Sequence, residues 1–186
     1  MFEVRNLAIL ILNNIAPLLY VLSTRLLRYC HPEWRCRYWS NRELRKLGHL
    51  FQGDIINVSG WKDQDKEGGY YADYFPQKSS YSISNIKGEH GLSGQKNEIY
   101  LNLEEDLPDN LHKKFDVVFN HTVLEHVYDI RKAGANLCTL SRNIVIVVVP
   151  FMQPMHWEPE SYLDYWRPTP FVFDKLFKEN GFEIIY

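Results

Sequence analysis

Short apolar runs alternate with stretches of helical spacing through the chain from about residue 40 onwards. Runs such as "DIINVSG" and "FDVVFNH" are typical of strands buried on both faces. We predict strands over residues 54–60, 81–86, 97–103, 115–121, 143–150 and 183–186. Helical spacing predicts helices over residues 41–51, 123–140 and 169–182. This alternation is typical of a layered α/β domain with a parallel sheet.

Local signals mark where these elements begin and end. Asn41 is a suitable N-cap for the first helix of the domain, and the last helix has Pro170 in its first turn and Gly181 as its C-cap. Residues 61–80 are polar and aromatic, with Gly68, Gly69 and Pro76 among them. They therefore predict a loop with at most a short helix.

The amino terminus carries an apolar run, "LAILILNNIAPLLYVL", over residues 7–22. It is shorter than the roughly 20 residues of a membrane-spanning helix, contains Asn13, Asn14 and Pro17, and lacks the flanks of a cleaved signal peptide. A basic and aromatic segment, "TRLLRYCHPEWRCRYW", follows. Two interpretations are favoured, a helix that packs on the domain or on a partner subunit and a helix at a membrane surface, and a helix that spans the membrane is the disfavoured third. We assign residues 1–40 to this helical extension and residues 41–186 to the α/β domain.

Composition narrows the class of protein. With 186 residues and 45% hydrophobic content, the chain has the size of one domain with a real core. A net charge of -2 argues against a nucleic-acid partner, although the first 50 residues hold eight Lys or Arg against three acids. The cysteines, Cys30, Cys36 and Cys138, are too few for a disulfide framework and form no Cys-x-x-Cys pair. We expect a reducing, cytoplasmic location, peripheral at the membrane if the amino-terminal helix binds there.

Three segments carry a family resemblance: "FDVVFNHTVLEHVYD", "NIVIVVVPF" and "HWEPESYLDYWRPTPFVFDKLFKENGF". They resemble the second half of class I S-adenosylmethionine-dependent methyltransferases, and most of all the small methyltransferase-like proteins found with polysaccharide-assembly enzymes. The resemblance covers roughly residues 45–186. It implies a doubly wound, Rossmann-like, mostly parallel sheet of about six strands, with S-adenosylmethionine across the carboxyl ends of the first strands. It also implies methyl transfer to a hydroxyl of a saccharide or lipid-linked glycan.

The cofactor-binding segments depart from the family pattern. The family places an acid and alternate glycines after strand one, and acids after strands two and three. The corresponding residues here are Asn57, Ser59, Gly60, Trp61, Asn85 and Asn102, of which only Gly60 matches. Asparagine accepts hydrogen bonds without charge assistance, at a cost of about 1 kcal/mol per contact. These residues bind the cofactor weakly or serve as turn and cap residues. Asn120 and His121, at the tip of strand four, are further candidates for the cofactor pocket.

Glu125 and His126 follow strand four and are expected to start its crossover helix, where His126 is suited to act as general base on a hydroxyl. In similar ubiquinone-biosynthesis O-methyltransferases this pair belongs to a metal-binding set with another Glu three residues earlier. That position is Thr122 here, so we predict no metal site. His156, in an aromatic loop suited to cover an acceptor, is the second candidate base. Asp164 and Arg167 lie in the same loop, and one interpretation is that they pair with each other.

The end of the chain also departs from the family, whose sheets usually finish with two antiparallel strands. Only the first of these is predicted here, which leaves an open edge for another subunit, the amino-terminal helix or a membrane-associated partner to cover. A homo-oligomer or a partner protein is therefore expected. Two functions remain: a methyltransferase acting on a glycan acceptor, and a catalytically inactive methyltransferase-fold module that binds or scaffolds in a glycan-assembly complex.

Overall fold

A computed structural model describes residues 2–31, 35–88, 90–159 and 161–186. The chain divides into two compact units, Met1–Glu43 and Leu44–Tyr186. The division falls inside helix α2 (Cys36–Leu47), close to the domain boundary expected after residue 40. Each unit is described by itself.

The first unit consists of helix α1 (Phe2–Cys30) and most of α2. Leu18, Leu19 and Tyr20 are exposed on α1. Within the described residues, no helix combines the length and the apolar content that a bilayer crossing needs. Residues 32–34 of the basic and aromatic segment lie outside the described residues. The predicted N-cap at Asn41 is wrong, because α2 already begins at Cys36 and Asn41 lies inside it.

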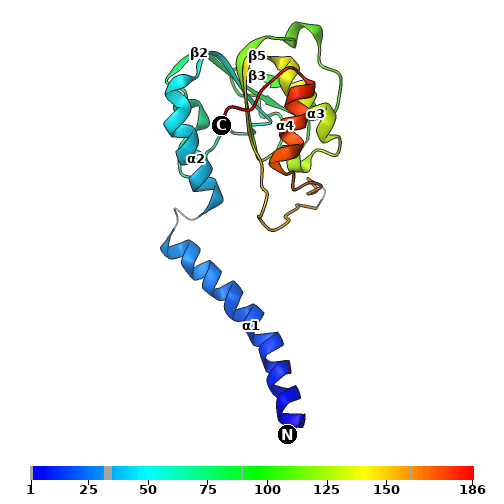
Figure 1. Ribbon diagram of the computed structural model, residues 1–186. Coiled ribbons are helices and arrows are strands. Elements are labelled where there is room, and N and C mark those ends of the chain that lie inside the picture. Colours follow the sequence, from blue (N-terminus) through cyan, green and yellow to red (C-terminus); the bar gives the residue numbers. More distant parts are fainter. Residues whose placement is uncertain (1, 32–34, 89, 160) are drawn as a thin grey trace. The chain divides into compact units, whose positions relative to one another are not determined.

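The second unit is built on a five-stranded sheet in the order β3-β2-β1-β4-β5, and every pair of neighbouring strands is parallel (Figure 1). The predicted α/β class with a mostly parallel sheet is confirmed. β1 stands at the centre because its residues Ile55, Ile56 and Val58 are fully buried. The strands are β1 (Gln52–Val58), β2 (Gln77–Asn85), β3 (Glu98–Tyr100), β4 (Phe115–His121) and β5 (Ser141–Val148).

The sixth predicted strand, over residues 183–186, does not form. Ile185 in this segment is 88% exposed and so contributes nothing to the core. Among the described residues, β5 therefore has β4 as its one neighbour in the sheet. A short apolar run forms a strand only where another strand pairs with it, and no strand in the described part of the chain pairs with residues 183–186.

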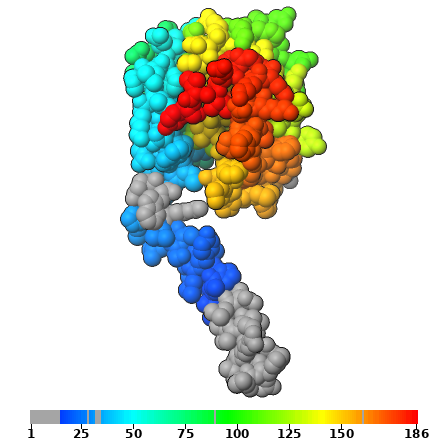
Figure 2. Space-filling view, in the orientation of Figure 1, coloured from blue at the N-terminus to red at the C-terminus, as the bar shows by residue number. Residues whose placement is uncertain are grey.

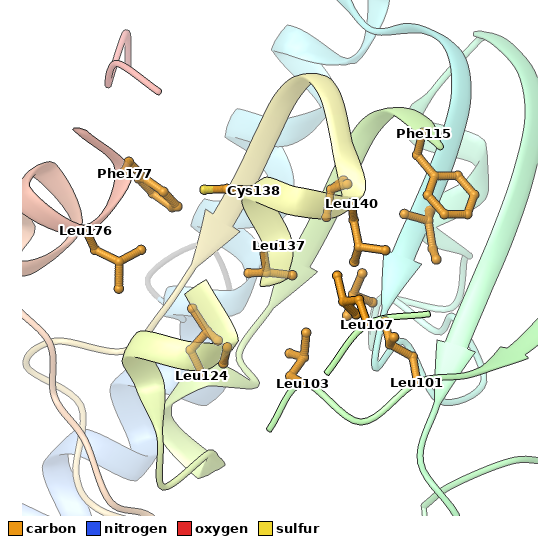
Figure 3. Close-up of a cluster of buried hydrophobic side chains, with 14 of the residues drawn as sticks. Leu101, Leu103, Leu107, Phe115, Leu124, Leu137, Cys138, Leu140, Leu176 and Phe177 are labelled. Carbon is orange, nitrogen blue, oxygen red and sulfur yellow. The ribbon is translucent and has the colours of Figure 1, made fainter. Parts of the chain in front are cut away.

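One face of the sheet packs against helices α3 (Ile130–Leu140) and α4 (Pro170–Glu179). Leu137 and Leu140 of α3 lie beside Leu103 and Leu107 in the segment after β3, whereas Cys138 points toward Phe177 of α4, as Figure 3 shows. Each such side chain contributes about 1.5–3 kcal/mol when fully buried. Figure 2 shows α4 and the residues that follow it, in orange and red, on the outer surface of this layer.

The opposite face carries a second, aromatic cluster. Instead of a crossover helix, the segment between β1 and β2 supplies one short 3-10 turn, η3 (Tyr71–Tyr74), as the prediction of a loop with at most a short helix had it, although residues 77–80 of the predicted loop belong to β2. The cluster contains Leu44, Ile55, Tyr71, Tyr74, Phe75, Val117 and Phe119. Both faces of the sheet are thus covered.

The start of helix α3 determines whether Glu125 and His126 belong to that helix. The Asp129 side chain caps α3 by accepting the Lys132 backbone N–H at 3.0 Å, so the helix begins at Ile130. Glu125 and His126 therefore lie before the helix, in the 3-10 turn η5 (Leu124–His126), and not at its start as predicted. Two further 3-10 turns are η2 (Gly48–Leu50) and η4 (Asp109–Leu111). α4 has Pro170 as its first residue, as predicted, and ends at Glu179; its C-cap is Asn180, and the predicted C-cap Gly181, with φ 79°, follows it.

Candidate functional site

A cavity of about 490 Å³ opens at the carboxyl edge of the sheet. This is where parallel strands place the loops that follow them, and where open α/β sheets bind ligands. Four residues singled out from the sequence line it: Ser59, Asn85 and Asn102 at the ends of β1, β2 and β3, and His126 in the η5 turn that follows β4. Ile86, Leu103, Val123 and Val127 give it apolar walls, and Tyr162, Leu163 and Tyr165 come from the loop after β5.

The turn after β1 is tied to β2 through its backbone. Ser59 and Trp61 have positive φ angles of 57° and 47°. The Ser59 N–H donates to Ser84 Oγ at 3.3 Å, and the Gly60 N–H donates to the Ser84 carbonyl at 3.2 Å. The Trp61 N–H donates to Asn85 Oδ1 at 2.7 Å. All three amides that a cofactor-binding turn offers to a ligand are therefore bonded within the protein.

The absence of a side chain at Gly60 leaves room for the side chain of Asn57. A Cβ added to Gly60 lies 2.5 Å from Asn57 Nδ2, closer than atoms pack. Asn57 is buried and donates to Asp63 Oδ1 at 2.7 Å. Burial raises the pKa of Asp63, although hydrogen bonds from Tyr81 and Asn57 oppose the shift. Asn57 and Gly60 thus form a packed structural pair beneath the turn and do not line the cavity.

Asn85 organises the loop that borders the cavity. Its Nδ2 donates to the Trp61 carbonyl at 3.1 Å and to Glu98 Oε1 at 2.6 Å. The Glu98 carboxylate also accepts backbone N–H groups from residues 93–95, the shortest from Gly94 at 2.6 Å. Partial burial opposes ionisation of Glu98, but these donors outweigh it and hold the pKa below its ordinary value. The Trp61 ring meets the His90 ring edge-on, with 4.6 Å between centroids.

The other predicted cofactor residues have different surroundings. Asn102 lines the cavity, donates to Glu105 Oε1 at 3.0 Å and accepts the Glu104 N–H at 3.0 Å. Asn120 is fully buried: its Nδ2 donates to the Val58 carbonyl at 3.0 Å, whereas Oδ1 has no hydrogen-bond partner among the described residues. His121 points to the aromatic face, with its ring 5.3 Å from that of Tyr71, and does not line the cavity.

The three predicted catalytic residues lie together. His126 Nδ1 is 2.9 Å from the Leu163 carbonyl, which can only accept, so this nitrogen carries the proton. Its Nε2 lies 3.7 Å from Oε1 of the fully buried Glu125. The His156 ring stands perpendicular to that of His126, with centroids 4.9 Å apart. Burial lowers the pKa of His126 and nearby His156 adds to the shift, while the bond to Leu163 opposes it.

The loop after β5 is held by an ion pair. Arg167 binds the Asp164 carboxylate and donates to the carbonyls of Gln153 at 3.1 Å and Pro154 at 2.9 Å. The Asp164 side chain is 1% exposed and accepts the His156 backbone N–H at 2.7 Å. Although burial alone raises the pKa of Asp164, Arg167 and the His156 N–H hold it below its ordinary value. Asp164 and Arg167 thus pair with each other, as one interpretation of the sequence had it.

Sequence reasoning missed several residues of the cavity. Ile86, His90 and Glu158 line it, and His90 Nε2 lies 3.0 Å from Glu158 Oε2. The position of Ile86 directly after Asn85 was a usable signal, because residues next to a strand end share its edge. No spacing signal could have joined His156 to Glu125 and His126, because the contact depends on how the loop after β5 folds back. The backbone bond from Tyr165 N–H to the Glu125 carbonyl, 2.8 Å long, makes that connection.

Comparison with known proteins shows the fold. No protein-family model matches the chain, and no curated protein matches it. Among solved structures, it is similar to a protein from Bacillus halodurans C-125 provisionally assigned as a methyltransferase, with TM-score 0.57 and 13% identity over 78% of this chain and 69% of the other. A protein from Rhodobacter sphaeroides, provisionally assigned to the zinc-dependent alcohol dehydrogenases, gives TM-score 0.48 and 14% identity over 73% of this chain and 63% of the other. The second unit thus has a Rossmann-like fold shared with the methyltransferase-type protein.

Proposed function

We propose that the protein is an S-adenosylmethionine-dependent O-methyltransferase whose acceptor is a hydroxyl of a saccharide or lipid-linked glycan. One observation carries this proposal: the cavity at the carboxyl edge of the sheet combines an apolar wall with an imidazole. Ile86, Leu103 and Val123 supply the wall, and His126 supplies the imidazole. Cavities of this size and composition are typical of small-molecule sites.

The residues present fit the nucleoside part of this cofactor. The apolar walls suit an adenine ring, and Asn102 supplies polar atoms beside them. When bound, S-adenosylmethionine supplies a methyl group on a sulfonium.

The side chains of this chain position and deprotonate the acceptor. Because His126 carries its proton on Nδ1, Nε2 has the lone pair that takes a hydroxyl proton. Glu125, 3.7 Å away, stabilises the imidazolium that forms. His156 is the second base of the cluster. Tyr162 and Tyr165 cover the cavity with aromatic surface suited to a sugar ring, and alignment of the acceptor supplies most of the rate.

We propose that the protein also has a partner and works at a membrane surface. The exposed apolar side chains of α1, together with Arg25 near its end, suit a membrane surface with anionic headgroups. The outer edge of β5 suits a second copy of the chain or a partner protein, because an unpaired strand edge is normally covered. The protein then works in the cytoplasm, peripheral at the membrane, and no nucleic acid takes part.

A second candidate function is a catalytically inactive binding or scaffolding module. It is favoured by the turn after β1, whose Ser59, Gly60 and Trp61 amides are all bonded to β2. A turn of this kind holds the fold together without a ligand. The two functions differ in whether the chain binds the cofactor.

Calorimetric titration of the full chain with S-adenosylmethionine, and separately with S-adenosylhomocysteine, tests the proposal. We expect micromolar binding that Ile86→Asp weakens at least tenfold, because a charge replaces part of the apolar wall. Leu92→Asp is the matched control, since Leu92 is also exposed on the segment between β2 and β3 but does not line the cavity. Absence of binding at millimolar cofactor supports the inactive module instead. Transfer of labelled methyl to an extracted glycolipid fraction then tests the acceptor.

A further inference from the structure

We propose that Glu125, His126 and His156 form a binding site for a divalent transition-metal ion. Each residue offers one ligand atom, and the three atoms all lie within 4.8 Å of one another. Two imidazoles and one carboxylate are a ligand set of catalytic zinc sites and of other transition-metal sites. The third ligand comes from the loop after β5, and Thr122 has no part in the set.

The distances suit a metal with short bonds. Ligand atoms at about 2.0–2.1 Å from a tetrahedral Zn²⁺ stand about 3.4 Å apart. His126 Nε2 and Glu125 Oε1, 3.7 Å apart, are already close to that spacing. Glu125 and His126 are fixed by burial and by the η5 turn. The His156 side chain is half exposed and its ligand atom lies within 4.8 Å of the other two, so a small adjustment of this side chain would bring the three atoms to that spacing.

Contacts outside the set orient both imidazoles, a hydrogen bond for His126 and an ion-pair contact for His156. The Leu163 carbonyl accepts from Nδ1 of His126 at 2.9 Å, which leaves Nε2 as the donor atom toward the metal. Asp164 Oδ2 lies 3.4 Å from Nδ1 of His156, which leaves the other ring nitrogen for the same purpose. A carbonyl or a carboxylate on the second nitrogen is the usual support of a metal-binding histidine. These two contacts therefore give both histidines the support that a metal site needs in addition to its three ligands.

The site faces the cavity. His126 lines it, together with Tyr162, whose ring centroid is 4.4 Å from that of His126. Three protein ligands leave a fourth position of a tetrahedral ion open to water or to a ligand in the cavity. Metal binding stands apart from the proposed function. A catalytic use of the ion does rest on the proposed function: the bound ion would polarise the acceptor hydroxyl, in place of proton removal by a free imidazole base.

Competition titration with a chromophoric chelator tests the site, using tag-free, EDTA-treated full chain and Zn²⁺ alone. We expect one Zn²⁺ per chain with a micromolar or lower Kd, and no displacement of Zn²⁺ by Mg²⁺, which prefers oxygen ligands. His156→Ala raises the Kd at least tenfold, since even supporting contacts are worth about 10–100-fold in affinity. Glu125→Gln, which keeps the side-chain volume, also raises the Kd for Zn²⁺. His112→Ala, at an exposed histidine outside the set, leaves the Kd unchanged.

An unchanged Kd in His156→Ala, or no Zn²⁺ binding at concentrations on the order of 100 μM, overturns the proposal. Circular dichroism of each variant separates lost ligation from lost folding, and the exposed His156 makes its variant the decisive one. Because the titration contains no cofactor, its failure leaves the cofactor-binding result untouched. Titration of S-adenosylmethionine into the EDTA-treated chain tests the proposed function by itself.

Discussion

Asn85 and Trp61 are joined by a reciprocal pair of hydrogen bonds: Asn85 Oδ1 accepts the Trp61 N–H at 2.7 Å, and Asn85 Nδ2 donates to the Trp61 carbonyl at 3.1 Å. Only an amide can both accept and donate in this way. The second Nδ2 hydrogen is used by Glu98 Oε1, at 2.6 Å. An asparagine at this position is therefore a requirement of the turn itself.

Asn85→Asp is expected to destabilise this turn. The new carboxylate faces the Trp61 carbonyl and the Glu98 carboxylate without a proton to donate, so we expect the free energy of unfolding to fall by about 1–3 kcal/mol in urea denaturation. Adding Glu98→Gln restores a donor and removes the like charge, so the double variant regains part of the loss. Equal stability of Asn85→Asp and the parent chain would show that the pair of bonds contributes nothing.

Gly60→Ala tests why this turn keeps its glycine. The added Cβ meets Asn57 Nδ2 at 2.5 Å and Cγ at 2.6 Å, and overpacking of this kind costs about 1–3 kcal/mol. In an Asn57→Ala background the obstacle is absent, so the two substitutions together cost less than the sum of their separate effects. A double-mutant cycle by urea denaturation measures the difference, and strict additivity contradicts the packing explanation.

Glu98 gives the stability a pH dependence. Its folded-state pKa lies below the ordinary value of 4.5, so its contribution is present above that value and is lost as the pH falls through the folded pKa. Glu98→Gln is therefore less stable than the parent chain at neutral pH, by about 1 kcal/mol after solvent screening. The difference narrows as acid protonates Glu98 in the parent. Thermal melts across the acid range measure it, and a difference independent of pH contradicts the prediction.

Arg167→Ala removes the partner of a buried carboxylate. Asp164 is left buried without the guanidinium, at a cost of about 3 kcal/mol in the free energy of unfolding, and the loop after β5 becomes open to proteases. Arg142→Ala is the matched control, because Arg142 is 43% exposed and its pairs with Asp54 and Asp116 are worth about 1 kcal/mol or less. Melting curves and limited proteolysis compare the two. Equal effects of the two substitutions would contradict a structural role for the buried pair.

Local patterns predicted much of this fold because they encode local structure. The apolar runs around Ile55 and Val118 marked the central strands, and Pro170 with Gly181 marked the ends of α4. The predicted strand at residues 183–186 failed because a strand depends on a partner, which a local run does not contain.

The candidate site was predictable in part. Parallel strands bring their carboxyl ends to one edge, which placed Ser59, Asn85 and Asn102 around one cavity. The roles of these residues were not predictable, because the bonds from Asn85 to Trp61 and Glu98 depend on how the glycine-containing loop folds. The meeting of His156 with Glu125 depends likewise on contacts between segments distant in the sequence.

The all-parallel sheet also determines the order in which the domain can assemble. Each strand pair joins segments separated by a long connection, and β1 pairs with β4 across about 62 residues, as the bond from Asp54 N–H to Asp116 shows. Such high contact order slows folding, because the entropy cost of closing the loop comes before the strand pair contributes any stability. During synthesis, β1 emerges first and keeps one edge unpaired until β4 has left the ribosome. The central strand of the finished domain is thus the one exposed longest to misassembly and to chaperones while the chain is made.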